Sequence, residues 1–444
     1  MIRRLAASPS FAALRHRNFR LLWLGQLVSF SGTMMQSAAV LWHVALLAPP
    51  DQKGWALGLV GLVRFVPIVL FSMLSGVVAD AHDRRRLMLI TQSLMALSAL
   101  VLATLAFGGL STTWPLYALT AFGAAAGAFD GPARQSLIPQ LVPREVLPNA
   151  ISLNTIMFQI AAVFGPTVAG LLIATAGLPW VYALNALSFV AVIVALLAMR
   201  GVPEPAAGER SDVSFKSALE GLHFTFSNPL IRSTMLLDFL ATFFSSATAL
   251  LPIFAQDILR VGARGYGWLY AAPSVGAMLA GAVMVRVADR IERRGRVLLA
   301  AVAVYGIFTV LFGISRSFAL TFLCLAVTGA ADTVSMVLRN VIRQLATPDS
   351  MRGRMTGVNM VFFMGGPQLG ELEAGLVAQA WTAPWSVITG GIGCLVATAW
   401  TAWRTPELRA YRKADSVGVV VPAPARGAVA LGEASPPAGR DAAE

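Results

Sequence analysis

Twelve long apolar runs follow one another along this chain of 444 residues. A helix needs about 20 apolar residues to cross the hydrocarbon of a bilayer, because it rises about 1.5 Å per residue. Six runs lie at about 19–48, 54–79, 87–108, 114–138, 149–176 and 179–199, and six more at about 230–257, 265–288, 296–314, 318–346, 354–381 and 384–403. They lack the ten-residue alternation of a transmembrane β-barrel. The sequence therefore predicts an all-α polytopic membrane protein with twelve transmembrane helices.

Composition excludes several other classes of protein. Hydrophobic residues make up 57% of the chain and charged residues 13%, about half the charged share of a soluble protein. The net charge of +12 comes from arginines in short loops beside apolar runs, so we expect no binding of nucleic acid. We also expect no enzyme, cofactor, metal or direct use of ATP, because there is no catalytic set, no phosphate-binding loop, and no metal-ligand spacing among Cys324, Cys394, His16, His43, His82 and His223.

The loops between the runs differ in charge on the two sides of the membrane. With the N-terminus inside, the cytoplasmic connections are 80–86, 139–148, 200–229, 289–296 and 347–353. The outer connections hold few basic residues, namely Lys53, Arg260, Arg264 and Arg316. Because basic residues collect in cytoplasmic loops, this asymmetry predicts that both ends of the chain are cytoplasmic.

The chain divides into two halves of six runs. We expect a basic N-terminal segment at 1–18, a six-helix bundle at 19–199, a cytoplasmic linker at 200–229, a second bundle at 230–404 and a disordered cytoplasmic tail at 405–444. The halves echo each other with a shift near 205, which pairs Asp130 with Asp332 and Asn154 with Asn359. This echo predicts a parallel repeat about an axis along the membrane normal. The apolar spacing of Phe215, Leu219, Leu222 and Phe226 predicts an amphipathic linker helix on the membrane surface.

A short charged stretch recurs at matching places in the two halves. The first copy reads Gly76-Val-Val-Ala-Asp80-Ala-His-Asp-Arg84-Arg85-Arg86, and the second keeps Asp289, Arg293 and Arg294 at the same spacing. The pattern resembles the loop between helices 2 and 3 of the major facilitator superfamily, G-x-L-a-D-r-x-G-r-r/k. The string FDGPARQSLIPQLVP at 129–143 is similar to the enterobactin-exporter and macrolide-efflux branch. Together the resemblance covers roughly 18–404.

This resemblance implies a fold, a location and a conformational device. It implies twelve helices in two pseudo-symmetric halves, a monomer in the bacterial inner membrane, and a substrate site between the halves near the midplane. In the family the loop arginine pairs with an acid on helix 4, where Asp130 stands. We therefore expect a latch that closes the cytoplasmic side, built from Gly76, Asp80, Arg84, Arg85, Asp130, Asp289, Arg293, Arg294 and Asp332. The alternative is that these pairs only fix the loops.

A second set of charges lies deeper in the runs. Arg64 and Glu371 each lie about ten residues from the outer end of their runs, and helices 2 and 11 are neighbours in the superfamily, so we expect them to pair. Asp238 lies about eight residues from the cytoplasmic end of a helix that lines the family's central cavity. Ionisable groups in a membrane are costly and mark functional sites. The candidates for substrate binding and proton coupling are Arg64, Asp238, Glu371, Gln36, Asn154 and Gln159. A static structural role is the alternative.

These features predict a secondary active transporter that works by alternating access. The resemblance favours proton-coupled efflux of a small amphipathic molecule, such as a drug or a siderophore-like compound. Two alternatives stay open, an importer or uniporter of the same fold and a membrane sensor that binds a ligand without transporting it. Uptake in place of release would indicate the first, and binding without flux the second.

Overall fold

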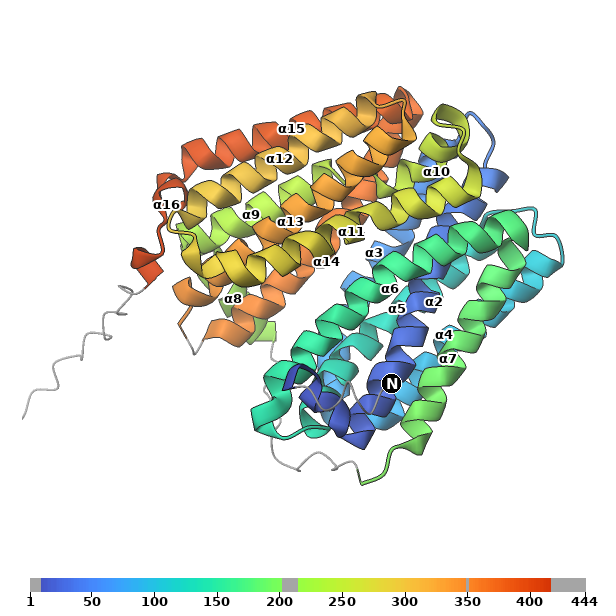
Figure 1. Cartoon of the computed structure of the whole chain (residues 1–444), viewed down its shortest axis with the longest axis horizontal. Coiled ribbons are helices and arrows are strands. Elements are labelled where there is room, and N and C mark those ends of the chain that lie inside the picture. The colour runs from blue at the N-terminus through green and yellow to red at the C-terminus, as the bar shows by residue number, and fades with distance from the viewer. Residues whose placement is uncertain (1–8, 202–214, 349–350, 417–444) are drawn as a thin grey trace, which may run out of the picture.

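The computed structural model describes residues 9–201, 215–348 and 351–416, and within that part of the chain every regular element is a helix. The first half holds six long helices, α2 (Arg17–Leu47), α3 (Lys53–Ala81), α4 (Arg84–Phe107), α5 (Trp114–Leu137), α6 (Leu147–Thr175) and α7 (Leu178–Ala198). The second half holds α9 (Pro229–Phe244), α11 (Gly262–Val287), α12 (Arg294–Ile314), α13 (Phe318–Ala346), α14 (Arg352–Ala380) and α15 (Ala383–Arg404). Figure 1 shows the halves as two separate bundles.

Nine of the described helical segments are long and apolar enough to cross a membrane. Three more long helices, α2, α5 and α14, lie in the same two bundles and have 31, 24 and 29 residues. The predicted all-α polytopic class is therefore confirmed, whereas the count of twelve spans stays a prediction.

Local sequence explains where several helices begin. Asp83 lies at the N-cap of α4 and its side chain accepts hydrogen bonds from the backbone N–H groups of Arg85 and Arg86. Asn228 caps α9 in the same way. Such side chains satisfy N–H groups that have no partner within the helix. Proline occupies the first turn of α5, α6, α7, α9 and α15, where its missing N–H costs nothing.

The run at 230–257 is broken in the structure, although the sequence predicts a single helix there. α9 ends at Phe244, Ser245 and Ser246 are not helical, and the chain resumes as a 3-10 turn at Ala247–Leu250, α10 (Leu251–Ile253) and a π-helical turn at Phe254–Ile258. Serine side chains compete with the helical hydrogen-bond ladder. Here the Ser246 hydroxyl donates to the carbonyl oxygen of Pro367 on α14 at 2.9 Å. Broken helices in transporters line cavities rather than lipid.

The two halves share one core at one end of the molecule and have separate cores at the other. The shared core includes Leu41 and Val60 from the first half and Phe254 and Tyr266 from the second. We call this the closed end; it carries the connections after α2, α4, α6 and α12. At the opposite end, the open end, one core belongs to the first half and others to the second half. In Figure 1 the bundles meet near α10 and diverge toward α8 (Phe215–Ser227).

Glycines let helices of the two halves approach closely at the closed end. On α3 and α14, a Cβ atom added to Gly54 would lie 2.7 Å from the backbone nitrogen of Gln379. On α6 and α11, a Cβ atom added to Gly170 would lie 2.8 Å from the Cα atom of Gly267. Small residues at such positions let helix backbones pack together in a membrane. Two helix pairs, α3 with α14 and α6 with α11, therefore pack closely across the interface.

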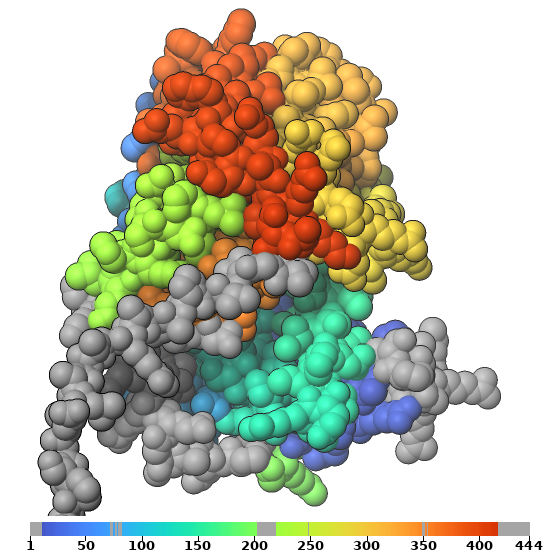
Figure 2. Space-filling model, turned by 90° about the vertical axis from the view of Figure 1, so that its left-hand side faces the viewer, coloured from blue at the N-terminus to red at the C-terminus, as the bar shows by residue number. Residues whose placement is uncertain are grey.

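The end of the described chain packs against the open end of the second half. Residues 405–416, at the start of the expected tail, form α16 (Pro406–Ala410) and a 3-10 turn at Ala414–Ser416. The backbone N–H of Gly295 donates to the carbonyl oxygen of Tyr411 at 3.1 Å. In Figure 2 the red C-terminal segment lies against the yellow segment near residue 290. Residues 1–8 and 417–444 of the two expected terminal segments, and 202–214 of the linker, lie outside the described residues.

Candidate functional site

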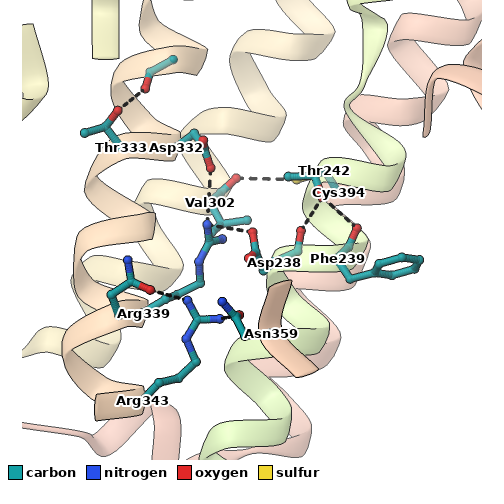
Figure 3. A network of polar contacts seen from close by, with 12 residues as sticks. Asp238, Phe239, Thr242, Val302, Asp332, Thr333, Arg339, Arg343, Asn359 and Cys394 are labelled. Carbon is teal, nitrogen blue, oxygen red and sulfur yellow. Dashed lines mark hydrogen bonds and ion pairs between the residues drawn. The ribbon is translucent and has the colours of Figure 1, made fainter. Parts of the chain in front are cut away.

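A buried ion-pair cluster connects α9 to α13 in the second half (Figure 3). Arg339 on α13 lies 2.8 Å from a carboxylate oxygen of Asp238 on α9, and both side chains are 2% exposed. The same Arg339 nitrogen, Nη2, lies 3.5 Å from Asp332 Oδ1, two turns away on α13. The structure therefore places Asp238 inside the second half, where it forms an ion pair with Arg339.

A second buried arginine, Arg343, lies one turn from Arg339 and is held by amides rather than by carboxylates. Its guanidinium donates to the side-chain oxygen of Asn340 at 2.6 Å and to that of Asn359 on α14. Arg343 is 3% exposed. The cluster therefore connects three helices, α9, α13 and α14, and contains two cations and two carboxylates.

The first half holds a related but different arrangement around Asp130 on α5. Asp130 accepts hydrogen bonds from Gln92 at 2.8 Å and Thr91 at 3.1 Å on α4, and it lies 3.7 Å from Arg134. The Arg134 guanidinium lies 4.5 Å from the centre of the Phe30 ring on α2, within the range of a cation–π interaction. Asp130 and its counterpart in the repeat, Asp332, thus each lie near an arginine of their own helix, but Asp130 is buried and Asp332 is 43% exposed.

The loop arginines of the expected latch bond to backbone within their own half. Arg84 donates to the carbonyl oxygen of Ser136 on α5 at 3.4 Å. Arg85 donates to the carbonyl oxygens of Leu196 at 2.7 Å and Leu197 at 3.2 Å, near the end of α7. The structure thus pairs Asp130 with Arg134 rather than with a loop arginine. Gly76 and Asp80 belong to α3, but the contacts of these two residues lie outside what the structure describes.

The second loop contacts the C-terminal segment. Lys413 Nζ donates to the carbonyl oxygen of Asp289 at 2.7 Å, and the Lys413 N–H donates to that of Glu292 at 2.8 Å. Arg294 is 6% exposed. Arg293, at the N-cap of α12, is exposed. In this conformation the chain's own C-terminal segment therefore packs against the second copy of the loop motif.

A third polar group lies where the two halves meet. Arg64 on α3 lies within electrostatic range of Glu371 on α14 and of Tyr270 on α11. Its guanidinium also lies 3.5 Å from the carbonyl oxygen of Ser37 on α2. Glu371 is 6% exposed, and its Oε2 atom makes no hydrogen bond within the described part of the chain. The structure thus places Arg64 and Glu371 within electrostatic range of each other, and it holds Asp238 in a different cluster.

The remaining predicted site residues lie on α2 and α6 of the first half. The Gln36 side-chain oxygen accepts a hydrogen bond from Asn185 on α7 at 2.7 Å, so it connects helices within the first half. Asn154 and Gln159 are half-buried on α6.

The sequence prediction missed the polar contacts that join the halves at the closed end. Lys53 at the start of α3 lies 3.1 Å from Asp257 in the π-helical turn. The Gln379 side chain accepts from the Trp55 N–H at 3.2 Å and donates to the carbonyl oxygen of Asp51. The Tyr266 hydroxyl donates to the carbonyl oxygen of Ala38 at 2.8 Å. Lys53 stood out as a basic residue in an outer loop, but nothing in the sequence identified its partner.

The family model described as "Transmembrane secretion effector" matches residues 8–425. An enterobactin exporter of Escherichia coli O1:K1 / APEC is 27% identical over 399 residues, which are 90% of this chain and 94% of that one. An enterobactin exporter of Shigella boydii serotype 18 has the same identity and coverage.

Two solved structures are similar in fold across most of their length. A bacterial homologue of the iron transporter ferroportin, in an inward-facing state, has a TM-score of 0.67 at 18% identity and covers 89% of this chain and 99% of its own. A bacterial homologue of the human lysosomal transporter Spinster, inward-facing and unoccupied, has a TM-score of 0.68 at 15% identity and covers 89% and 98%.

Proposed function

Since the chain belongs to the transmembrane secretion effector family of the major facilitator superfamily, and is therefore a membrane transporter rather than an enzyme, we propose that it exports a small amphipathic molecule by alternating access in exchange for protons. The enterobactin exporters support the outward direction, because the match covers 94% of their length. The proposed substrate class is drug-like or siderophore-like.

The observation that carries this proposal is the asymmetry between the two ends of the molecule. One hydrophobic core joins both halves at the closed end, and each half keeps its own core at the open end. A transporter that alternates must open one end as it closes the other, and well-packed interfaces switch between discrete arrangements. The short basic loops lie at the open end, so we infer that this end faces the cytoplasm and that the conformation is inward-facing.

The coupling step is proposed to use the carboxylates that lie within the helices. Glu371 on α14 lies within electrostatic range of Arg64 on α3, so separation of the halves would remove this cation from its surroundings. Asp238 pairs with Arg339 of the same half, so this contact does not cross the interface. A carboxylate whose surroundings differ between two conformations links their equilibrium to proton binding. Arg64, Asp238 and Glu371 are therefore the proposed coupling groups, with Gln36, Asn154 and Gln159 as polar contacts for the substrate.

The test is transport by the purified full-length protein in proteoliposomes. A panel of siderophores, macrolides and lipophilic cations is offered in counterflow, with and without an imposed pH gradient. Export of at least one compound that increases with the gradient is expected. Exchange that ignores the gradient indicates a uniporter, accumulation in the direction of uptake indicates an importer, and binding without flux indicates a sensor. Each of these results would overturn proton-coupled export.

The orientation is tested separately. Cysteines introduced at 51 and 111, both in closed-end connections, should react with an impermeant thiol reagent added outside intact cells. Reaction at 51 only after the membrane is opened would overturn the model with both ends in the cytoplasm.

A further inference from the structure

Asp332 is a half-exposed carboxylate at the midpoint of a membrane-length helix. α13 has 29 residues, and Asp332 is the fifteenth of them. It therefore lies roughly 21 Å from either end of the helix at 1.5 Å per residue. Its side chain is 43% exposed, whereas those of Asp238 and Arg339 are 2% exposed. Among these three groups, Asp332 is the one that is open to its surroundings.

The apolar surface of α13 lies on the side opposite to Asp332. Leu323 is 54% exposed and precedes Asp332 by nine residues, which places it 180° around the helix at about 100° per residue. Leu345 is also exposed and lies about 140° from Asp332. A charged group that faced hydrocarbon would be very costly. Asp332 therefore faces the space inside the protein, which contains water when the open end is open.

One nitrogen of Arg339 serves both carboxylates of the cluster. Arg339 Nη2 lies 2.8 Å from Asp238 Oδ1 and 3.5 Å from Asp332 Oδ1. A change of charge at Asp332 therefore alters the interaction of Arg339 with Asp238. Asp238 lies six residues before the end of α9 at Phe244, where the helix breaks. The cluster thus connects a water-facing carboxylate to the broken helix (Figure 3).

The other groups around the cluster do not compete for this role. Arg343 on α13 donates to Asn340 and to Asn359 of α14, and it lies within electrostatic range of Asp238 and Arg339. Tyr305 on α12 lies within electrostatic range of Asp332, Asp238 and Arg339, and of Cys394 on α15. From α11, the backbone of Pro273 packs against α13 at Gly329. Asp332 and Asp238 are therefore the carboxylates that Arg339 contacts.

We propose that Asp332 is the carboxylate at which protons from the water between the halves act on the second half, and that Arg339 passes this change to Asp238 on α9. The proposal rests on the proposed proton-coupled transport and assigns proton entry to Asp332 rather than to Asp238. A proton from water that binds a carboxylate oxygen of Asp332 neutralises it. Arg339 then keeps one anionic partner, Asp238, and the constraint between α13 and α9 changes.

The first test is chemical and needs no substrate. The full-length protein in phosphatidylcholine–phosphatidylglycerol vesicles is treated with a water-soluble carbodiimide and glycine ethyl ester. The carbodiimide activates a protonated carboxyl group, the amine displaces the resulting urea, and an amide remains that mass spectrometry locates. Asp332 should be modified, more at mildly acidic than at mildly alkaline pH, and Asp238 should not. Glu145, exposed in the loop before α6, is the positive reference. Asp332 modified no more than Asp238 would overturn the proposal.

The second test measures conformation. Spin labels at Arg86→Cys and Gln344→Cys, both exposed and one in each half, report the distance across the open end. The distance distribution of the labelled parent should change with pH, Asp332→Asn should abolish that change, and Asp332→Glu should retain it. Glu145→Gln is the matched control and should respond as the parent does. A pH response that survives in Asp332→Asn, or a parent without one, contradicts the proposal.

Neither test requires export, so the two ideas can fail separately. If the proteoliposomes export nothing while the distances still respond to pH through Asp332, only the proposed function falls. If export follows the pH gradient in Asp332→Asn as in the parent, the function stands and the role of Asp332 falls.

Discussion

Gly58 on α3 and Gly375 on α14 lie so close together that a Cβ atom added to Gly375 would sit 2.5 Å from the Cα atom of Gly58. Real Cβ atoms do not approach a neighbour so closely, and the obstacle is backbone rather than a flexible side chain. The contact is also a contact between the two halves. The closed end therefore depends on the absence of a side chain at this crossing.

Gly375→Val should weaken the closed end, because a side chain forced into a packed interface costs about 1–3 kcal/mol. We expect a lower melting temperature in detergent and faster reaction of a cysteine introduced at 51. Gly357→Val on the same helix is the matched control, since a Cβ atom there would meet nothing within 4 Å. Equal effects of the two changes would show that the Gly58–Gly375 contact does not hold the end closed.

The helical class and the division into halves could be predicted because they depend on length and apolarity along the chain. The break after Phe244 could not be predicted, because serine also occurs inside unbroken helices. At this site the Ser246 hydroxyl bonds to the carbonyl oxygen of Pro367 on α14, which is distant in the sequence. The depth argument placed Arg64 near Glu371 because both positions can be counted from a helix end.

The partner of Asp238 could not be predicted by counting residues from a helix end. Arg339 lies 101 positions later, and no repeat in the sequence connects α9 to α13. The ion pair forms because the fold brings two buried charges together, and each would be costly alone. Similarly, Lys53 and Asp257 lie in different halves, so their contact depends on the conformation of the whole molecule.

Arg339→Met should be strongly destabilising, by about 3–5 kcal/mol, because it removes the guanidinium that pairs with the buried carboxylate of Asp238. Adding Asp238→Asn should recover much of the loss, since the uncompensated charge is then gone. The apparent free energy of unfolding is measured by titration with SDS in mixed micelles. Arg354→Met is the control: its pair with Glu220 is about 40% exposed on both sides and is worth about 0–1 kcal/mol. A double variant as unstable as the sum of the single variants would contradict the pairing.

Exchange of the charges of Lys53 and Asp257 should leave the closed end intact, whereas Asp257→Lys alone should open it more often. The ion pair is partly exposed, with side chains 19% and 49% accessible, so its contribution is small and decreases at high salt. Spin labels in the connections after α2 and before α11 report the distance. The Lys53→Asp/Asp257→Lys variant should restore the parent's distance distribution at low salt. If it resembles the single variant instead, the contact has no part in closure.

The latch of the first loop should act in the conformation opposite to the present one. Arg84 and Arg85 now bond to backbone of α5 and α7, so Asp80→Asn is expected to leave the present conformation intact. It should make closure of the open end less favourable and increase the share of long distances between labels at positions 86 and 344. Glu145→Gln is again the control, because it removes a carboxylate of the same end. An unchanged distance distribution in Asp80→Asn would leave the loop with a purely structural role.

Gly295→Ala should release the C-terminal segment from the second half. A Cβ atom at Gly295 would lie 1.7 Å from the carbonyl oxygen of Leu408, and the bond from the Gly295 N–H to Tyr411 would break with it. Leu408 and Tyr411 are buried in this contact.

Burial raises the pKa of Tyr411, so docking favours the neutral phenol. The contribution of Tyr411 should therefore be complete below the ordinary tyrosine value of about 10 and be lost only as the pH rises through the raised one.

Limited digestion with trypsin measures this release, because Arg409, Arg412 and Lys413 all lie in the docked segment. Cleavage follows the population of the undocked form when undocking is fast, so Gly295→Ala should be cut several-fold faster than the parent at neutral pH. Gly281→Ala on α11 is the matched control, because a Cβ atom there would meet nothing within 4 Å. If both variants were cut at the parent's rate, the contacts of Lys413 with the second loop would have to hold the segment without Gly295. Lys413→Ala in the Gly295→Ala background would then have to release it, because it removes the bond from Lys413 Nζ to the carbonyl oxygen of Asp289.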